Sequence, residues 1–297
     1  MRYIISTARG TESIASEELK EIIKDFSNSD NFFFCETSEP EKLKALQSAY
    51  HVIKIVSESD NFESLFDYPE ADEEKNLKSF YCSSPREYKE DLIEALSKKK
   101  YLKFSHPDIY YFLLTLKHKF YLGIDMFGDL SKRDYRIFTT RFSLKGPVAY
   151  AFGAYGLKIN DPPKKAAIII TTDGSEAIEF IKKFPGTEAF GYCLEENLMK
   201  GAMKNMIVAG LKNKIRLFPG IDIKEKDFDR IIFPMNFYRT LKGVDSISIL
   251  NSIIKQDCLA KDGVISILTL PEIAEKIKYS KKQEIWQGNN KLVILTI

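Results

Sequence analysis

The chain has 297 residues, of which 44% are hydrophobic and 29% are charged. This composition is typical of a folded globular protein and excludes a disordered or collagen-like chain, and the length suits two or three domains. No run of about 18 uncharged apolar residues occurs, so we expect no membrane-spanning helix and no membrane partner. The N-terminus predicts a strand and a helix rather than a signal peptide.

The cysteines and histidines exclude two further classes of protein. The four cysteines are far apart in the sequence and the three histidines are scattered. Zinc sites and disulfide frameworks need closely spaced or regularly spaced ligands and thiols. We therefore expect no metal and no disulfide, and a reducing, cytoplasmic location.

The net charge of +2 hides two oppositely charged stretches. Residues 60–96 contain eleven acidic and four basic residues, whereas residues 97–145 contain eleven basic and four acidic ones. Clustered lysine and arginine supply most of the sequence-independent affinity for a polyanion, so the second stretch is a candidate nucleic-acid surface. A solvated surface is the alternative, and charge alone does not decide between them.

The first half of the chain predicts two α+β runs. In the first run, the pattern predicts strands over 2–7, 31–36 and 51–58, and helices over 12–25 and from Pro40. After an acidic linker or loop over 61–76, the second run predicts a strand over 78–84, a helix over 86–100 and paired strands over 108–119 and 120–128. Both runs mix strands and helices in the manner of small α+β modules.

Beyond Pro147 strands and helices alternate to the end of the chain. The expected strands are 166–172, 188–195, 214–220, 228–235 and 263–270, and the expected helices are 148–157, 175–184, 196–211 and 245–259. This alternation predicts a mainly parallel, doubly wound sheet, whose ligands bind beyond the carboxyl ends of the strands. Residues 284–297, with a turn at Gly288-Asn289-Asn290, predict a β-hairpin at an antiparallel edge.

The run from His106 to Pro147 resembles the end of a THUMP domain and its linker to a methyltransferase domain. The matching residues are Pro107, Asp108, Tyr121 to Asp125, Leu130, Ser131, Arg133, Tyr135, Arg136 and Ser143-Leu144-Lys145-Gly146-Pro147. The N-terminal run TARGTESIASEELKEI also resembles the opening of these proteins. The chain is thus similar to the THUMP-containing tRNA guanine-N2 methyltransferases.

This resemblance implies an α/β protein in four parts. They are a ferredoxin-like N-terminal module (1–60), a THUMP domain (61–130), a linker (131–150) and a Rossmann-fold methyltransferase domain with an antiparallel edge hairpin (151–297). The implied cofactor is S-adenosylmethionine, and the implied partner is tRNA, gripped at its acceptor end. The exocyclic amine of guanine is a poor nucleophile, so the base must be flipped, desolvated and aligned with the methyl group.

The glycine-rich motif of the family is altered in this chain. The family pattern, similar to Asp-Pro-x-Cys-Gly-Ser-Gly-Thr, aligns with residues 170–177 and retains Gly174 and Ser175. Ile170 replaces the leading Asp, and Glu176 replaces the second Gly. A carboxylate and a Cβ at position 176 should obstruct a cofactor that the backbone must approach closely, unless the side chain points outwards.

The acidic positions of the cofactor site are altered as well. Cys193 replaces the acid that holds the ribose hydroxyls; Glu195 is its candidate substitute, although a glutamate there also suits the first turn of a helix. Asp222 is displaced by one position from the acid of the next motif. The resemblance assigns cofactor binding to Ser143, Lys145, Asp173, Gly174, Ser175, Glu195 and Asp222.

The catalytic loop of the family, Asn/Asp-Pro-Pro-Tyr, has its counterpart near residues 228–238. A gapless alignment places Pro234 at the catalytic position, and a slip of two residues makes Asn236-Phe237-Tyr238 the equivalent. The amide of Asn236 would then accept hydrogen bonds from the guanine amine, and a ring of Phe237 or Tyr238 would stack on the base. We take these three residues as the candidate catalytic set.

The basic stretch supplies the candidate tRNA contacts. They are Lys98, Lys99, Lys100, Lys103, Lys117, Lys119, Lys132, Arg133, Arg136 and Arg141. Tyr101, Tyr110 and Tyr111 lie among them, with packing in a strand core as the alternative to base stacking. The hypotheses are an active guanine-N2 methyltransferase, a catalytically impaired tRNA-binding protein or partner subunit, and a methyltransferase with a rearranged pocket and another acceptor.

Overall fold

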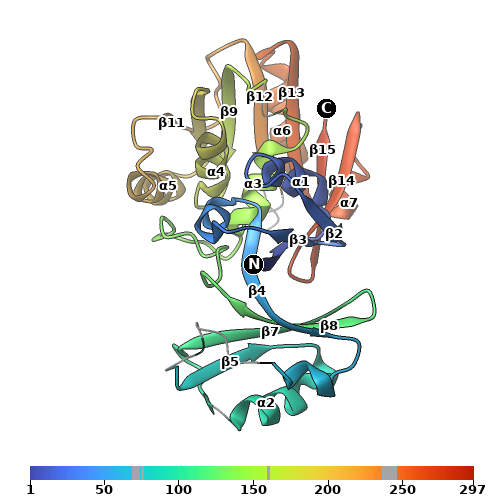
Figure 1. Cartoon of the computed structure of the whole chain (residues 1–297). Helices are drawn as coiled ribbons and strands as arrows, with labels where there is room; N and C mark the ends of the chain where they lie inside the picture. The colour runs from blue at the N-terminus through green and yellow to red at the C-terminus, as the bar shows by residue number, and fades with distance from the viewer. Residues whose placement is uncertain (69–73, 75–76, 99, 159–160, 236–245) are drawn as a thin grey trace. The chain divides into compact units, whose positions relative to one another are not determined.

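The structure, a computed structural model, describes residues 1–68, 74, 77–98, 100–158, 161–235 and 246–297 (Figure 1). The chain divides into two compact units, which we call unit 1 (Met1–Thr7 and Ser16–Leu130) and unit 2 (Ala8–Ala15 and Ser131–Ile297). No helix in the described ranges is long and apolar enough to cross a membrane. Those ranges also contain no cluster of three or more His, Cys, Asp or Glu residues placed to hold a metal ion.

Unit 1 is built on an eight-stranded sheet in the order β2-β3-β1-β4-β8-β7-β5-β6. Its strands are β1 (Arg2–Thr7), β2 (Phe26–Ser29), β3 (Phe32–Glu36), β4 (Ala49–Ser59), β5 (Ser79–Ser83), β6 (Tyr101–Leu102), β7 (Ile109–Leu116) and β8 (Lys119–Asp125). Neighbouring strands are antiparallel except that β5 runs parallel to both β6 and β7. The long strand β4 pairs with β1 on one side and with β8 on the other, so it is common to both α+β runs of the sequence.

Short helices complete unit 1. They are α1 (Glu12–Lys20), which begins in the segment grouped with unit 2, α2 (Lys89–Ser97), and the 3₁₀ turns η1 (Pro40–Ala45), η2 (Glu63–Phe66) and η4 (Arg86–Tyr88). Leu92 and Leu96 of α2 are buried against Phe80, Tyr111 and other core residues of the sheet. The division of residues 1–130 into a ferredoxin-like module and a THUMP domain stays a prediction.

Two predicted helices of unit 1 are shorter in the structure. The helix predicted over 12–25 ends at Lys20, because residues 26–29 form the unpredicted strand β2. This strand has a single apolar residue, Phe26, and it is defined by its hairpin with β3, in which Asp30 takes a left-handed φ of 50°. The helix predicted from Pro40 is only a 3₁₀ turn, since Ala49 already belongs to β4.

Unit 2 contains a seven-stranded sheet in the order β11-β10-β9-β12-β13-β15-β14. Its strands are β9 (Lys165–Ile170), β10 (Glu188–Cys193), β11 (Ile215–Pro219), β12 (Phe228–Pro234), β13 (Leu259–Thr269), β14 (Lys281–Gln287) and β15 (Asn290–Thr296). The first five strands are parallel, and β15 is antiparallel to both β13 and β14. The predicted α/β class and the doubly wound sheet with an antiparallel edge hairpin are confirmed.

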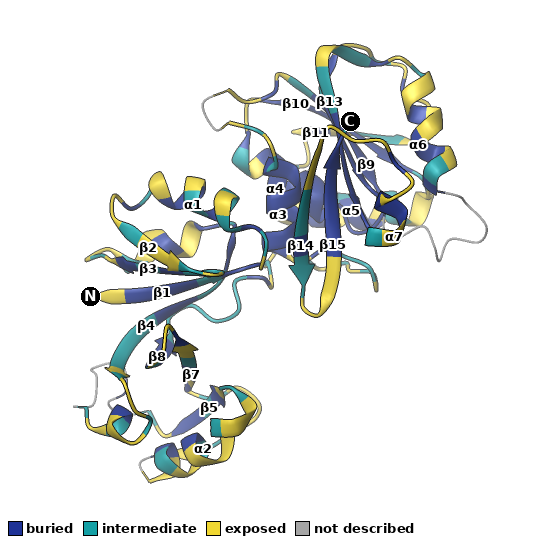
Figure 2. Cartoon of the chain, turned by 90° about the vertical axis from the view of Figure 1, so that its right-hand side faces the viewer, coloured by how far each residue is buried: buried dark blue, intermediate teal, exposed yellow. Residues whose placement is uncertain are grey.

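Helices cover both faces of this sheet. They are α3 (Gly146–Ala154), α4 (Ser175–Lys183), α5 (Glu196–Val208), α6 (Ser246–Lys255) and α7 (Pro271–Ala274). Figure 2 shows the strands buried between α3 and α4 on one side and α6 on the other. Because strand residues alternate between the faces, Ala167 and Ile169 point into the core that Ile249 and Ile253 of α6 complete.

Gly201 of α5 offers a test of how the segment before α3 is packed. A Cβ at this position would overlap the ring of Phe138. We expect Gly201→Ala to lower the free energy of unfolding by about 1–3 kcal/mol, after the gain of up to about 1 kcal/mol in helix propensity is allowed for. Urea unfolding measures the change. Gly186→Ala is the control, since its Cβ would enter open space, and equal stability of the two variants would contradict the packing described.

Candidate functional site

The loop between β9 and α4 lies where a doubly wound sheet places its ligand. Strand β9 has β10 on one side and β12 on the other, so the strand order reverses at its carboxyl end. Gly174 makes the tight turn of this loop with a left-handed φ of 75° and caps α4. A Cβ on Gly174 would lie 2.9 Å from the Cβ of Ala202 on α5, so glycine is required here for space as well as for conformation.

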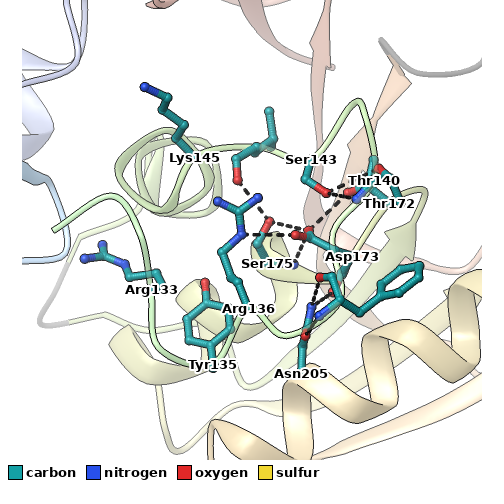
Figure 3. Close-up of polar contacts among 12 residues, drawn as sticks. Arg133, Tyr135, Arg136, Thr140, Ser143, Lys145, Thr172, Asp173, Ser175 and Asn205 are labelled. Atoms are coloured by element: carbon teal, nitrogen blue, oxygen red, sulfur yellow. Dashed lines mark hydrogen bonds and ion pairs between the residues drawn. The ribbon is translucent and has the colours of Figure 1, made fainter. Parts of the chain in front are cut away.

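Asp173 is the centre of a buried polar network in this loop (Figure 3). Its fully buried carboxylate accepts hydrogen bonds from the Ser175 hydroxyl (2.8 Å) and the Ser175 backbone N–H (3.2 Å). The guanidinium of Arg136 forms an ion pair with the same carboxylate, with 3.1 Å between Nε and Oδ2. Asp173 also lies just before the N-terminus of α4, where the helix dipole favours a negative charge.

A second buried ion pair involves Glu179 of α4, six residues after Asp173. Arg133 donates two hydrogen bonds to the carboxylate of Glu179, at 2.9 Å and 3.2 Å, and the hydroxyl of Tyr135 donates a third at 2.6 Å. Glu179 is fully buried and Arg133 is only 12% exposed. Gly146 leaves the room that the Arg133 side chain occupies. Burial, followed by the Glu179 carboxylate, raises the pKa of Tyr135 well above its ordinary value.

Asn205 of α5 joins the same loop to the segment before α3. Its amide nitrogen donates to the backbone carbonyls of Asp173 (2.9 Å) and Phe138 (2.8 Å), and its oxygen accepts from the backbone N–H of Phe138 (2.9 Å). The three bonds satisfy a side chain that is completely buried. Residues 133–138 are therefore fixed on α4 and α5 by side chains from both helices.

Glu176 is the unusual residue of the site. Its side chain is completely buried, and neither carboxylate oxygen has a hydrogen-bond partner within the described part of the chain. Burial first, and then the nearby Asp173 carboxylate, raise the pKa of Glu176 to about 8. The backbone N–H groups of Thr171 and of Glu176 itself lower this pKa. They offset only part of the increase, because neither is placed to form a hydrogen bond with the carboxyl group. Glu176 is therefore a largely neutral acid at pH 7.

The other two altered motif positions are also buried. Ile170 is fully buried at the end of β9, and its Cδ1 atom would lie 2.9 Å from a Cβ at Gly191 on β10, so it fills space inside the sheet. Cys193 ends β10 and is 1% exposed. Burial first, and then the Glu176 carboxylate, raise the pKa of Cys193 to about 12, so its thiol stays protonated. Neither residue offers a charged acceptor.

The structure brings some of the predicted cofactor residues together and separates others. Asp173, Gly174 and Ser175 form the loop described above, and the Ser175 hydroxyl reaches the backbone carbonyl of Leu144, next to Ser143. The Ser143 hydroxyl bonds with Thr140. The Lys145 side chain is exposed and points away from Asp173 in Figure 3.

The remaining predicted residues of the cofactor site and the catalytic loop are not part of this network. Glu195 is exposed at the N-terminus of α5, and Asp222 is exposed with only a 3.9 Å ion pair to Lys224. Asn236, Phe237 and Tyr238, the candidate catalytic set, lie outside the described residues. Their role stays a prediction.

The predicted RNA-binding residues of unit 1 differ in exposure. Lys98, Lys117 and Lys119 are exposed and Lys103 is half-buried, whereas Lys99 lies outside the described residues. Lys100 is buried, and its ammonium donates to the backbone carbonyls of Glu74 and Leu77. This environment gives Lys100 a structural role in place of a surface contact.

The predicted RNA-binding residues of unit 2 fall into two pairs. Lys132 and Arg141 are exposed, whereas Arg133 and Arg136 are engaged with Glu179 and Asp173. Sequence reasoning missed these two ion pairs. Glu179 could have indicated one of them, because it lies between apolar residues of a predicted helix and a carboxylate buried there requires a cationic partner.

Comparison with known proteins identifies the fold. No protein-family model and no curated protein matches the sequence. TrmN from Thermus thermophilus has a TM-score of 0.80 at 16% identity, covering 99% of this chain and 98% of TrmN. SMU.472, named as a methyltransferase and solved in complex with SAH, has a TM-score of 0.68 at 18% identity, covering 99% and 97%. A protein named as a predicted N6-adenine-specific DNA methylase from Listeria monocytogenes has a TM-score of 0.70 at 14% identity, covering 99% and 95%. The chain therefore has a methyltransferase fold along nearly its whole length.

The Arg136–Asp173 pair can be tested through stability. Arg136→Met leaves the Asp173 carboxylate buried without its cation, and we expect the free energy of unfolding to fall by about 3–5 kcal/mol. Lys200→Met is the control, because it breaks the exposed pair between Lys200 and Glu196 and should change stability by less than about 1 kcal/mol. Urea unfolding gives both values, and a loss below about 1 kcal/mol for Arg136→Met would show that the pair does not hold the loop.

The raised pKa of Glu176 predicts a pH dependence of stability. The folded protein holds this proton up to about pH 8, whereas an unfolded glutamate loses it near 4.5. The contribution of Glu176 is therefore complete below pH 4.5 and is lost as the pH rises through 8. Glu176→Gln removes this loss, so the variant should gain stability relative to wild type between pH 5 and 9, on the order of a few kcal/mol. Parallel stability–pH curves would contradict the burial of the acid.

Proposed function

We propose that this protein binds tRNA through an exposed aromatic and basic surface of unit 1. We call it the aromatic–lysine surface and define it by Tyr81, Tyr101, Phe104, Tyr110, Lys98 and Lys103. The observation that carries the proposal is the exposure of its rings: Tyr101 is 58%, Phe104 77% and Tyr110 40% exposed. Large apolar side chains gathered at the surface mark an interaction site more often than they are neutral.

The strand pairing explains why these rings face outwards. Strand β5 pairs with β7 so that Tyr81 lies opposite Tyr110, and with the two-residue edge strand β6. Phe80 and Tyr111 point into the core, so their neighbours Tyr81 and Tyr110 point to the other face. The Tyr81 ring makes edge-to-face contacts with the rings of Phe104 and Tyr110, at centroid distances of 6.0 Å and 5.9 Å.

The chemistry of this surface fits an RNA strand. Bases stack on exposed aromatic rings, and lysines beside them neutralise the phosphates. An open groove of about 550 Å³ borders the surface and is lined by Lys78, Lys98 and Tyr101, among others. The resemblance of residues 106–147 to THUMP-containing tRNA methyltransferases and the full-length likeness to TrmN support tRNA as the RNA.

Methyl transfer from S-adenosylmethionine to a guanine N2 of tRNA is the second candidate function. It is favoured by the retained scaffold of the site, namely the left-handed Gly174 turn and the buried Asn205 that fixes it. A catalytically impaired tRNA-binding protein, or a partner subunit of an enzyme, is the alternative. Methylation of unmodified tRNA in the presence of labelled S-adenosylmethionine distinguishes the two.

The aromatic–lysine surface predicts two separable effects on tRNA binding. Lys98→Gln with Lys103→Gln should weaken binding and reduce the slope of log affinity against log salt by about 1.4, since each lysine neutralises about one phosphate. Phe104→Ala should weaken binding by about 1–3 kcal/mol and leave that slope unchanged. Fluorescence titration of a tRNA transcript at several salt concentrations measures both.

The control for the lysine pair is Lys212→Gln with Lys214→Gln, which removes the same charge from two exposed positions of unit 2. If the control and the Lys98/Lys103 variant lose the same affinity, binding depends only on net charge. Unchanged binding in both the Lys98/Lys103 and Phe104 variants would remove this surface as the RNA site.

A further inference from the structure

We infer that the cofactor position of this methyltransferase fold is closed by Glu176, so that the chain does not bind S-adenosylmethionine or S-adenosylhomocysteine there. The inference concerns the sheet of unit 2 and goes beyond the proposed RNA binding, on which it does not depend. A closed cofactor position favours a tRNA-binding protein over an active methyltransferase, because methyl transfer by this chain alone would require S-adenosylmethionine.

The position of Glu176 follows from the way such sheets hold their ligands. In nucleotide-binding sheets, the loop after the first strand uses one glycine for a tight turn and a second, two residues later, so that the backbone can approach the ligand. Gly174 makes the tight turn here. Glu176 stands at the second position, where any side chain separates the backbone from a ligand.

The Glu176 side chain points inwards. It is completely buried, and its carboxyl group interacts electrostatically with Asp173 of its own loop and with Cys193 at the end of β10. The carboxyl group is therefore buried close to the carboxyl ends of β9 and β10, the strand ends beside which such a sheet binds its ligand. An outward-pointing Glu176 would have left this region free, and the structure excludes that arrangement.

The residues around Glu176 do not fit the cofactor either. Two ribose hydroxyls need a carboxylate acceptor at the end of β10, and the buried, protonated thiol of Cys193 is a weak acceptor. Glu195, two residues later, is exposed at the N-terminus of α5 and is not part of the buried network. Asp222 has a side chain that is 79% exposed.

The loop is also fixed from outside, so a simple rotation does not open it. The Asp173 carboxylate is paired with Arg136, its carbonyl accepts from Asn205, and Gly174 lies against Ala202. Thr171, Thr172, Asp173 and Ser175 are all buried. Moving the start of α4 away from Cys193 would break a buried ion pair and the hydrogen bonds that satisfy Asn205.

Calorimetric titration with S-adenosylmethionine and S-adenosylhomocysteine, with and without unmodified tRNA, tests the inference. We expect no binding to wild type up to about 1 mM. Glu176→Gly with Cys193→Asp should restore binding with a dissociation constant below about 100 μM, a gain of at least tenfold. Glu196→Gly is the matched control, since it makes the same change in the exposed first turn of α5 and should leave the cofactor unbound.

Two results of this titration would contradict a closed cofactor position. Micromolar binding to wild type would overturn it, as would a folded Glu176→Gly/Cys193→Asp variant that still fails to bind. Circular dichroism and thermal unfolding establish folding, and the single variant Glu176→Gly, which removes the side chain and keeps the native thiol of Cys193, replaces the double variant if that one is unfolded. Binding of tRNA in the same preparations tests the proposed function separately, so loss of tRNA binding alone would leave this inference standing.

Discussion

Two buried arginine–carboxylate pairs anchor the segment that leads into α3. Arg136 with Asp173, and Arg133 with Glu179, bind residues 133–138 to the start of α4. A buried charge is strongly destabilising unless its partner is present, so each pair requires both of its members and fixes their positions. The position of Gly146, which leaves room for Arg133, follows from this arrangement. The loop at the carboxyl end of β9 consequently belongs to a rigid polar junction.

This junction changes what the loop can do. In a ligand-binding sheet the same loop is open at the strand ends and offers its backbone to the ligand. Here Asp173 is committed to Arg136 and Ser175, and the second acid, Glu176, is buried with no hydrogen-bond partner among the residues that the structure describes. Burial and the neighbouring Asp173 carboxylate keep Glu176 largely protonated near pH 7, whereas Arg136 is paired with Asp173. In the described part of this loop, the neutral side chain of Glu176 fills the interior, and Asp173 is engaged with Arg136 and Ser175.

The fold and the candidate site therefore place different requirements on the sequence. The fold is shared with structures of methyltransferases, and the Gly174 turn and the buried Asn205 serve its packing whether or not a ligand binds. The three positions that differ from the family motifs hold Ile170, Glu176 and Cys193, and all three are buried. The aromatic–lysine surface lies on another sheet, in unit 1, so the RNA binding proposed for it does not depend on the strand ends of unit 2.

The sequence by itself determined the alternation of strands and helices after Pro147, since periodicity and turn residues are local, and it identified Glu176 and Cys193 as departures from a motif. It could not determine strand β2, which has one apolar residue and exists through its hairpin partner. It left open whether Glu176 points inwards, and it took Arg133 and Arg136 as surface groups. Only the tertiary structure decided these points, because burial and ion pairing depend on residues far apart in the chain: Arg136 meets Asp173 and Arg133 meets Glu179 once the sheet and its helices have assembled.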